Sequence, residues 1–246
     1  MEAERELPTV VARMWGREPA SRRGPRPGLT LGRIADAAIV IADAEGLAGV
    51  RMSSVAARLG VSTMALYGYV ESKDDLLAAM VDTAAPDPPE PGDLSWRAYL
   101  AAWTRAHRDF LASHPWLLEV APLTPPVGPR ALRWLDRSLT MLTGAGLAAA
   151  EAVNITTTLS AYAVSAATLA VAMSGTVDEA GPEGPAGYAA MLSQLVDADG
   201  YPGLAAALES GAFGAAPEWV EDADFVFGLT LLLDGVEALI TRRKEG

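Results

Sequence analysis

Apolar side chains recur every three or four positions along most of this chain, and that period predicts α-helices. In residues 30–45 the apolar positions fall on one face, with Thr30 placed to cap the helix and Gly46 to end it. Further helices are expected at about residues 53–59, 63–70, 72–85, 93–113, 130–143, 148–174, 185–196, 203–209 and 218–242. No segment alternates clearly as a strand does. The expected fold class is therefore all-α, with a small N-terminal helical domain and a larger C-terminal bundle.

Proline marks the expected domain boundaries. Residues 1–28 contain four prolines among scattered charges, which is typical of a disordered arm. Residues 86–92 contain four more prolines within six positions, which neither a helix interior nor a sheet interior tolerates. We therefore expect a small helical domain at residues 29–85, a proline-rich linker at 86–92, and a larger helical domain at 93–246.

The net charge of −12 is distributed unevenly along the chain. Residues 1–75 carry 10 Lys/Arg and 10 Asp/Glu, a net charge of 0, and the remaining residues carry the whole excess of acid. Within residues 13–33 there are six arginines and one acidic residue. Such a basic segment can meet phosphates while the acidic remainder is repelled from nucleic acid. The plainer alternative is that these arginines only keep a tail solvated.

Composition also excludes several kinds of site and compartment. The chain has no cysteine, so disulfides, thiolate catalysis and Cys-ligated metal sites are excluded. The charged start, Met1 to Glu6, has no apolar run behind it, so we expect no signal peptide and a cytoplasmic protein. Residues 154–177 lack charge but are rich in Ser, Thr and Ala. A buried helix in a soluble bundle is therefore expected there rather than a membrane span.

The expected helices at 53–59 and 63–70 meet through a turn that needs glycine. Gly60 supplies the left-handed residue, Ser62 is placed to cap the second helix, and Val55 and Leu66 are placed to pack the pair together. This spacing suits a helix-turn-helix whose second helix enters the major groove of DNA. An ordinary αα-hairpin has the same local features, so the spacing alone leaves both interpretations open.

Two adjoining stretches resemble the tetracycline-repressor (TetR) family of transcriptional regulators. They are residues 59–62, with the letters LGVS, and residues 66–77, with the letters LYGYVESKDDLL. The resemblance is specific over about residues 30–82. It is looser in the C-terminal half, where residues 225–240 look like the closing helix of the branch nearest the tetracycline repressors. It implies a dimeric regulator, by default a repressor, that leaves a palindromic operator when a small hydrophobic effector binds.

The resemblance implies roles for individual residues in DNA binding. Thr63, Met64 and Ala65 would face base edges, and Tyr67, Tyr69 and Lys73 match positions that hold the phosphate backbone. We also expect the Tyr67 ring to pack in the domain core. The full set of expected DNA-binding residues is Arg51, Ser53, Ser62, Thr63, Met64, Ala65, Tyr67, Gly68, Tyr69 and Lys73.

The chain departs from the family pattern at the start of its second expected helix. Arg51 stands where a capping Ser or Thr is common, and the arginine often found near position 53 or 54 is replaced by serine. Gly68 stands where the family often has a larger contacting side chain. We hypothesise that Arg51 replaces the missing contact and that the arm around residues 22–26 adds minor-groove contacts.

A homodimer is expected because one short recognition helix reads too few base pairs for specificity, and two-fold related copies solve this. The resemblance implies that helices 148–174 and 218–242 form the dimer as a four-helix bundle, with the apolar stripe of 225–240 buried. Alternatively these helices form only the core of one protomer. The small residues expected to allow close approach are Ala161, Ala163, Ala166, Ala167 and Ala170.

Aromatic side chains are abundant in the C-terminal half, as a mostly apolar effector pocket requires. For any single one of them, a place in the core is the alternative. Asn154, Thr157 and Ser165 are possible polar partners of the effector. We expect the pocket to be lined by Trp96, Trp103, His107, Phe110, Trp116, Trp134, Thr158 and Tyr162. No cofactor or metal is expected, since His107 and His114 at a spacing of seven make no recognisable metal site.

Two other functions remain open from the sequence. An enzyme on a helical scaffold finds no support, because the chain has no catalytic motif, phosphate loop or metal cluster that we recognise. A protein-interaction adaptor with a degenerate helix-turn-helix is the other alternative, given Gly68 and the missing arginine.

For the regulator, the resemblance implies that an effector among the C-terminal helices tilts the helix at 72–85 and so changes the spacing of the two recognition helices.

Overall fold

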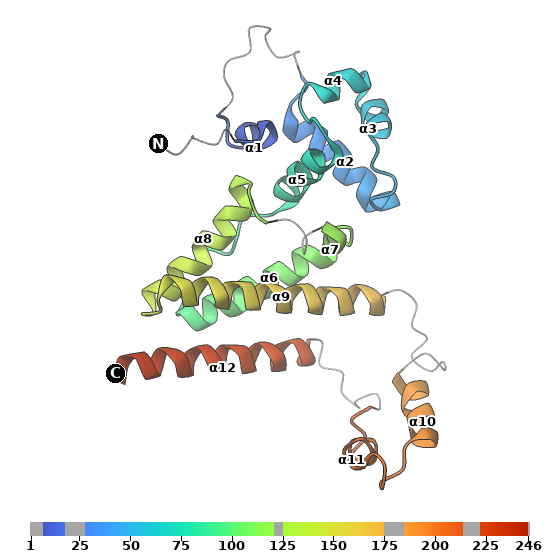
Figure 1. Cartoon of the computed structure of the whole chain (residues 1–246), viewed down its shortest axis with the longest axis vertical. Coiled ribbons are helices and arrows are strands. Elements are labelled where there is room, and N and C mark those ends of the chain that lie inside the picture. The colour runs from blue at the N-terminus through green and yellow to red at the C-terminus, as the bar shows by residue number, and fades with distance from the viewer. Residues whose placement is uncertain (1–6, 18–27, 121–124, 175–184, 214–221, 246) are drawn as a thin grey trace. The chain divides into compact units, whose positions relative to one another are not determined.

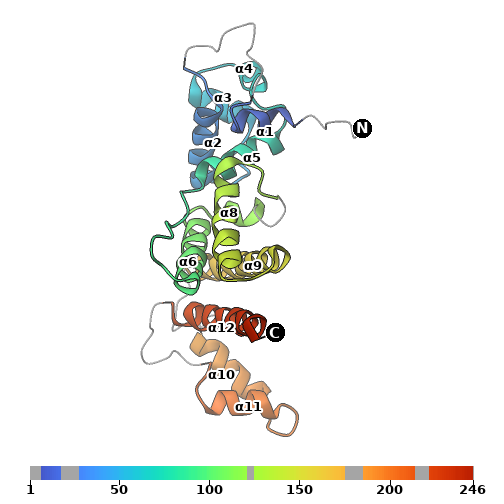
Figure 2. The ribbon, with the colours of Figure 1, turned by 90° about the vertical axis from the view of Figure 1, so that its left-hand side faces the viewer.

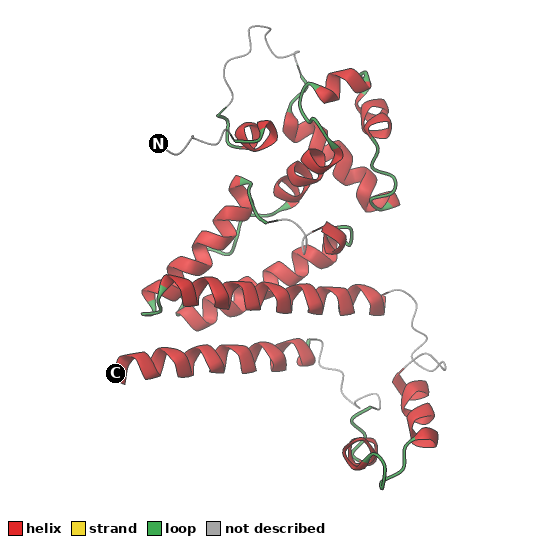
Figure 3. Ribbon diagram, viewed as in Figure 1, coloured by secondary structure: helices red, strands yellow, loops and turns green. Residues whose placement is uncertain are grey.

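The structure is a computed structural model that describes residues 7–17, 28–120, 125–174, 185–213 and 222–245. Within these ranges the secondary structure is helical and no strand occurs, as the periodicity predicts (Figure 3). The chain divides into two compact units. The first comprises residues 1–168 and 233–246, and the second comprises residues 169–232.

Five helices build the N-terminal part of the first unit (Figure 1). They are α1 (Thr9–Met14), α2 (Leu31–Glu45), α3 (Met52–Leu59), α4 (Thr63–Tyr67) and α5 (Lys73–Ala84). Helix α2 starts where Thr30 accepts a hydrogen bond from the Arg33 amide, at 3.2 Å, and it ends at Gly46 with φ of 68°. Helix α5 starts in the same way, because the Ser72 hydroxyl accepts from the Asp75 amide at 3.1 Å. The short-range capping signals therefore set these boundaries.

The turn between α3 and α4 has the geometry that the sequence predicts. Gly60 ends α3 in the left-handed region, with φ of 68° and ψ of 31°. Val55 and Leu66 are fully buried and join the two helices to one apolar core with α2 and α5. Helix α4 is shorter than expected, since it ends at Tyr67 rather than near residue 70. Ser62 holds the N-cap position, but its side chain makes no capping hydrogen bond, so that expectation was wrong.

Five helices of the C-terminal half lie wholly or partly in the first unit. They are α6 (Trp96–Ser113), α7 (Leu117–Val120), α8 (Pro129–Gly144), α9 (Ala149–Ser174) and α12 (Ala223–Glu245). Helix α8 contacts both α5 and α6, and Figures 1 and 2 show it running from the end of α5 to the layer formed by α6 and α9. The second unit contains α10 (Pro185–Leu195) and α11 (Pro202–Glu209), which contact each other. The expected start of the last helix, near residue 218, lies outside the described residues.

The N-terminal segment is not wholly the disordered arm that we expected. Its residues 9–14 form α1, which packs on α5 with Val10 buried. The Arg13 guanidinium lies over the ring of Tyr69, 5.6 Å from its centroid. The prolines suggested disorder, but the short helix α1 has an apolar side that packs on α5. The arginines at 22–26 lie outside the described residues, so their role stays a prediction.

Residues 86–92 contain no helix, as expected, but they do not form a free linker. They run along α8, and side chains of α8 bond to them. The Trp134 indole donates to the carbonyl oxygen of Pro86 at 2.8 Å. Arg133 pairs with Asp87 at 2.7 Å, and one turn later Arg137 pairs with Glu90 at 3.3 Å. Prolines prevent this segment from forming a helix, and α8 gives it a fixed course.

Helices α5 and α8 cap each other's ends at this junction. The Asp82 carboxylate, which is buried, accepts from the backbone amides of Arg130 and Ala131 at 2.9 and 3.0 Å, in the first turn of α8. In return the Arg130 guanidinium donates to the carbonyl oxygens of Thr83 and Ala85 at the end of α5, at 2.8 and 3.2 Å. Each charge meets the helix end whose dipole it complements. We call these contacts the α5–α8 clamp.

Helix α9 is exposed on more of its surface than a buried core helix would be. It is long and apolar enough to cross a membrane by length and composition, which for a single helix is weak evidence. Its inward side buries Ala152, Leu159, Ala163 and Ala167 in the protomer. Ala163 and Ala167 are therefore unavailable to a partner chain, contrary to our expectation, whereas Ala161 and Ala170 are exposed.

Gly128 provides a test of the α5–α8 clamp. A Cβ atom on this residue would lie 2.2 Å from the Asp82 carboxylate, which is held in place by the amides of α8. We predict that Gly128→Ala costs about 1–3 kcal/mol of stability through forced displacement of Asp82. That corresponds to a fall of roughly 2–12 °C in the melting temperature, measured by circular dichroism. Gly144→Ala, in the same helix with open space around it, should leave the melting temperature unchanged or higher. Equal melting temperatures for the two variants would contradict the clamp.

Candidate DNA-binding surface and effector site

The start of α4 is exposed to solvent. Thr63 and Met64 face solvent, and Met64 is 76% exposed although its side chain is large and apolar. Leu66, on the opposite side of the helix, is fully buried and fixes how α4 sits on α3. Ala65 is half-buried at the edge of this surface. The three residues expected to face base edges thus lie together at an accessible helix start.

Several other predicted DNA-binding residues of α3 and α4 are exposed. Arg51 and Ser53 are exposed at the beginning of α3, and Gly68 is exposed at the end of α4. Tyr67 is 48% exposed, so the expectation that its ring packs in the core was wrong. Its phenol is available to an external partner.

Tyr69 and Lys73 already have hydrogen-bond partners within the domain. The Tyr69 hydroxyl donates to the carbonyl oxygen of Leu29 at 2.9 Å, and this ties the segment before α2 to the end of α4. The Lys73 ammonium donates to the carbonyl oxygen of Leu47 at 3.2 Å. A phenol has one proton to donate and an ammonium has three. Lys73 therefore keeps donors for a phosphate, whereas Tyr69 does not in this conformation.

Three of the predicted effector residues form one aromatic cluster between α6 and α8. The ring centroids of Trp103 and His107 are 5.2 Å apart, those of Trp103 and Trp134 are 5.6 Å apart, and those of His107 and Trp134 are 5.7 Å apart. The Trp103 indole donates to the carbonyl oxygen of Trp134 at 3.0 Å. We call these three residues the aromatic cluster. Because Trp134 also donates to Pro86, the cluster is linked directly to the segment that follows α5.

Trp116 and Phe110, two of the other predicted effector residues, belong to a second group of side chains that contacts α2. Trp116 is buried and donates from its indole to the Asp43 carboxylate of α2 at 2.8 Å, and the His114 ring lies 2.7 Å from the same oxygen. Phe110 packs with this second group, its ring centroid 6.0 Å from that of His114. Trp96 and Tyr162 are half-buried. One part of the predicted pocket thus connects the C-terminal half to α2.

The polar residues predicted on α9 lie mostly on its exposed side. Asn154, Thr157, Thr158 and Ser165 are all exposed, and the hydroxyl groups of Thr157 and Thr158 donate to carbonyl oxygens of their own helix. The buried hydroxyl of this helix is that of Thr156, 3.0 Å from the hydroxyl of Ser138 on α8. The residue buried on α9 is thus one or two positions before the Thr157 and Thr158 that we expected. The spacing of apolar residues in the sequence does not distinguish between such neighbouring positions.

Tyr99 is a buried polar residue next to the aromatic cluster that the sequence analysis missed. It precedes Trp103 by four residues on α6, so the two share a helix face. Burial raises the pKa of Tyr99 to about 12, and the positive charge of Arg137 opposes that rise. Burial likewise lowers the pKa of His107 to about 4, so its ring is neutral at pH 7. Tyr99, Trp103 and His107 are spaced four residues apart, and this spacing could have identified Tyr99 from the sequence.

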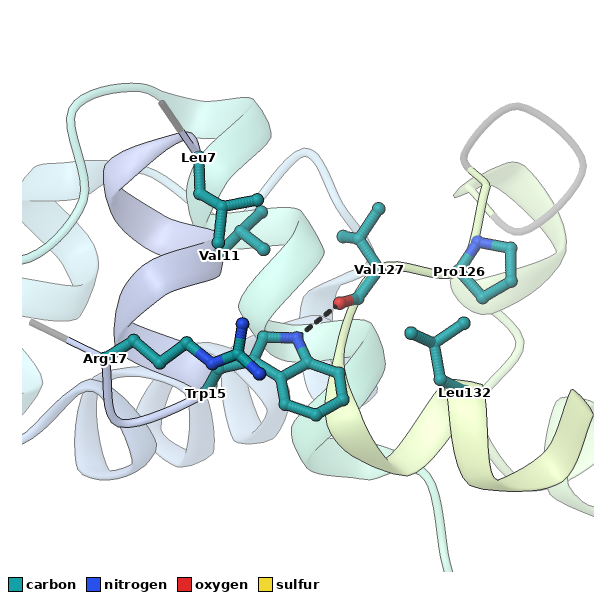
Figure 4. A pocket seen from close by; sticks show the side chains of 7 residues that line it. All are labelled: Leu7, Val11, Trp15, Arg17, Pro126, Val127 and Leu132. Carbon is teal, nitrogen blue, oxygen red and sulfur yellow. Dashed lines mark hydrogen bonds between the residues drawn. The ribbon is translucent and has the colours of Figure 1, made fainter. Parts of the chain in front are cut away.

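A further pocket of about 300 Å³ opens between α1 and the start of α8 (Figure 4). It is lined by Leu7, Val11, Trp15, Arg17, Pro126, Val127 and Leu132. The Trp15 indole donates to the carbonyl oxygen of Val127 at 2.9 Å, so α1 also touches the regulatory half. In the part of the chain that the structure describes, no three His, Asp or Glu side chains gather closely enough to hold a metal ion.

Comparison with known proteins gives consistent results along the whole chain. Residues 34–80 match the sequence profile of bacterial regulatory proteins of the tetR family, and residues 88–240 match that of the tetracyclin repressor-like C-terminal domain. The HTH-type transcriptional repressor DrrR1 of Streptomyces coeruleorubidus is 37% identical over 97% of this chain and 88% of its own length. The class A tetracycline repressor from transposon 1721 of Escherichia coli is 30% identical over 85% of this chain and 92% of its own length.

Solved structures agree with this. Apo ActR from Streptomyces coelicolor superimposes with a TM-score of 0.71 at 25% identity, covering 89% of this chain and all of that one. ActR in complex with actinorhodin gives a TM-score of 0.68 at 25% identity, covering 86% of this chain and 98% of that one. The exposed helix start of α4, the two matching profiles and these relatives show that the chain belongs to the TetR family and is a helix-turn-helix transcriptional regulator.

Proposed function

We propose that this chain is a homodimeric repressor that binds a palindromic operator through α4 of each copy and leaves it when a small apolar effector binds in the C-terminal half. The observation that carries the proposal is the exposed start of α4, held in place by a fully buried Leu66. A five-residue helix reads few base pairs, so specificity requires two copies about one DNA turn apart. Relatives named as repressors support the direction of regulation.

The exposed residues divide by the part of DNA that they suit. Thr63, Met64 and Ala65 are small or apolar, which suits base edges and the thymine methyl group. The Tyr67 phenol and the remaining Lys73 donors suit phosphate oxygens. Arg51, Ser53, Ser62 and Gly68 are also exposed, and we propose that they add contacts around this helix start. Tyr69 has a supporting role, because its single proton is given to Leu29.

The dimer is proposed to form through the exposed sides of α9 and α12. Helix α12 buries one stripe, which includes Phe225, Leu229 and Leu233, yet leaves Phe227 68% and Leu231 58% exposed. Such large exposed apolar side chains on one helix are typical of a protein–protein interface. The exposed side of α9, with its alanine and hydroxyl side chains, allows a partner helix to approach closely. Homodimers are typical of the TetR family, so we propose a second copy of this chain as the partner.

Release is proposed to pass through α8. A ligand that displaces the Trp134 ring also moves the indole that donates to Pro86, two residues after the end of α5. The α5–α8 clamp then transfers the shift to α5 and so to α3 and α4. Two recognition helices that change their separation cannot satisfy both half-sites together, so operator affinity falls.

DNA binding is tested first by footprinting on the DNA that flanks the gene encoding this chain. We predict salt-sensitive protection of a palindrome, and a three- to tenfold weaker affinity for Tyr67→Phe, because that variant loses about one phosphate hydrogen bond. Its melting temperature should not change, since the phenol is exposed. Tyr69→Phe is the matched control: it should lower the melting temperature through loss of the bond to Leu29. Absence of any protected site, or full operator affinity in Tyr67→Phe, would refute the assignment.

The dimer interface is tested by placing a charge on α12. We predict that Phe227→Glu weakens the dimer by about a hundredfold, because a buried carboxylate would face the partner without a counter-charge. Sedimentation analysis should then show monomers, and operator affinity should fall with them. Leu195→Glu on α10, where the side chain is 67% exposed, is the control and should remain a dimer. A dimeric Phe227→Glu variant would exclude this face of α12.

A further inference from the structure

Two polar atoms beside the aromatic cluster are shielded from solvent and have no hydrogen-bond partner. They are the hydroxyl oxygen of Tyr99 and Nδ1 of His107, both on α6. Tyr99 has no exposed surface at all. Buried polar atoms in native proteins are almost always bonded, so each unpaired atom needs an explanation. Here the two lie two helical turns apart, with Trp103 between them on the same helix face.

The surroundings of these atoms favour an uncharged, flat ligand. Trp103 and Trp134 supply indole rings that are almost fully buried. His107 is neutral at pH 7 because burial holds its pKa near 4, so it offers no positive charge to an anion. Arg137, whose positive charge lowers the pKa of Tyr99, is already paired with Glu90. An ionic ligand would therefore lose its hydration without gaining an opposite charge.

We propose that the effector is an uncharged aromatic compound with hydroxyl or carbonyl groups, anchored by the Tyr99 hydroxyl and by Nδ1 of His107. Its rings lie against Trp103 and Trp134. This inference deepens the proposed function and rests on it, since it concerns the effector site of the regulatory half. His107 is only half-buried as a whole side chain, so the ligand enters past its ring. Entry displaces Trp134 and with it the hydrogen bond to Pro86.

Three compounds with the same naphthalene ring system and different substituents test the proposed ligand chemistry. Calorimetric titration of the full-length wild-type protein uses 2,6-dihydroxynaphthalene, naphthalene and naphthalene-2,6-dicarboxylate. We expect the dihydroxy compound to bind at least about tenfold more tightly than naphthalene, since each anchored hydroxyl adds one hydrogen bond. The dicarboxylate should not bind measurably. The affinity for the dihydroxy compound should be the same at pH 6 and pH 8, because His107 stays neutral over this range. Equal binding of all three, tighter binding of the dicarboxylate, or no binding of the dihydroxy compound would overturn the proposal.

Two variants test the anchors themselves. Tyr99→Phe and His107→Phe should each weaken dihydroxynaphthalene binding about three- to tenfold and leave naphthalene binding unchanged. Tyr188→Phe, on α10 and 47% exposed, is the control and should bind like the wild type. The melting temperature of Tyr99→Phe should equal or exceed that of the wild type, because the hydroxyl has no partner to lose. A clearly lower melting temperature would show that the hydroxyl already has a partner, such as a buried water, and would overturn its role as an anchor.

The same preparations distinguish failure of this inference from failure of the proposed function. Each is also tested for operator binding by gel shift. A wild-type protein that binds its operator but does not prefer the dihydroxy compound overturns the ligand chemistry and leaves the DNA-binding function standing. A protein that shows the expected ligand preference but protects no DNA supports the anchors and refutes the repressor.

Discussion

The reciprocal capping of α5 and α8 is the contact on which the first unit depends. Asp82 is a buried carboxylate, and it is tolerated because two backbone amides of α8 bond to it. Arg130 returns a positive charge to the carboxyl end of α5. Gly128 makes room for this arrangement, since any side chain there would collide with Asp82. The end of α5 and the start of α8 are therefore joined directly by hydrogen bonds in both directions.

In the proposed mechanism, this junction gives an effector a route to the DNA-binding helices. Trp134 lies one turn beyond Arg130 on α8, and it touches both the aromatic cluster and the segment that follows α5. A second connection joins the regulatory half to α2, where Asp43 accepts from the indole of Trp116. A third runs from Trp15 of α1 to Val127. The DNA-binding helices are thus attached to the C-terminal half at three places, and in the proposed mechanism a shift of α8 reaches them through these contacts.

Local signals in the sequence predicted the helix ends well, because caps and left-handed glycines act within a few residues. Thr30 and Gly60 are the clearest examples, and the helix-turn-helix follows from them together with the family resemblance. Contacts between distant residues were not predictable. Asp82 and Arg130 are 48 positions apart and meet only once α6 and α8 have packed. The same reason explains why Tyr69 and Lys73 were assigned to phosphates while their partners at Leu29 and Leu47 went unseen. Helix α1 was missed because its stability comes from α5 and not from its own six residues.

In the proposed mechanism, operator binding and the aromatic cluster are energetically coupled through α8, so the coupling must act in both directions. The most direct test is fluorine NMR of the full-length protein labelled with 5-fluorotryptophan, whose six tryptophans give few signals. The resonances of Trp103 and Trp134 are assigned from single Trp→Phe variants. If the two sites are coupled, saturation with operator DNA shifts both resonances in the absence of any effector. Operator binding at saturation with both resonances unmoved would contradict it.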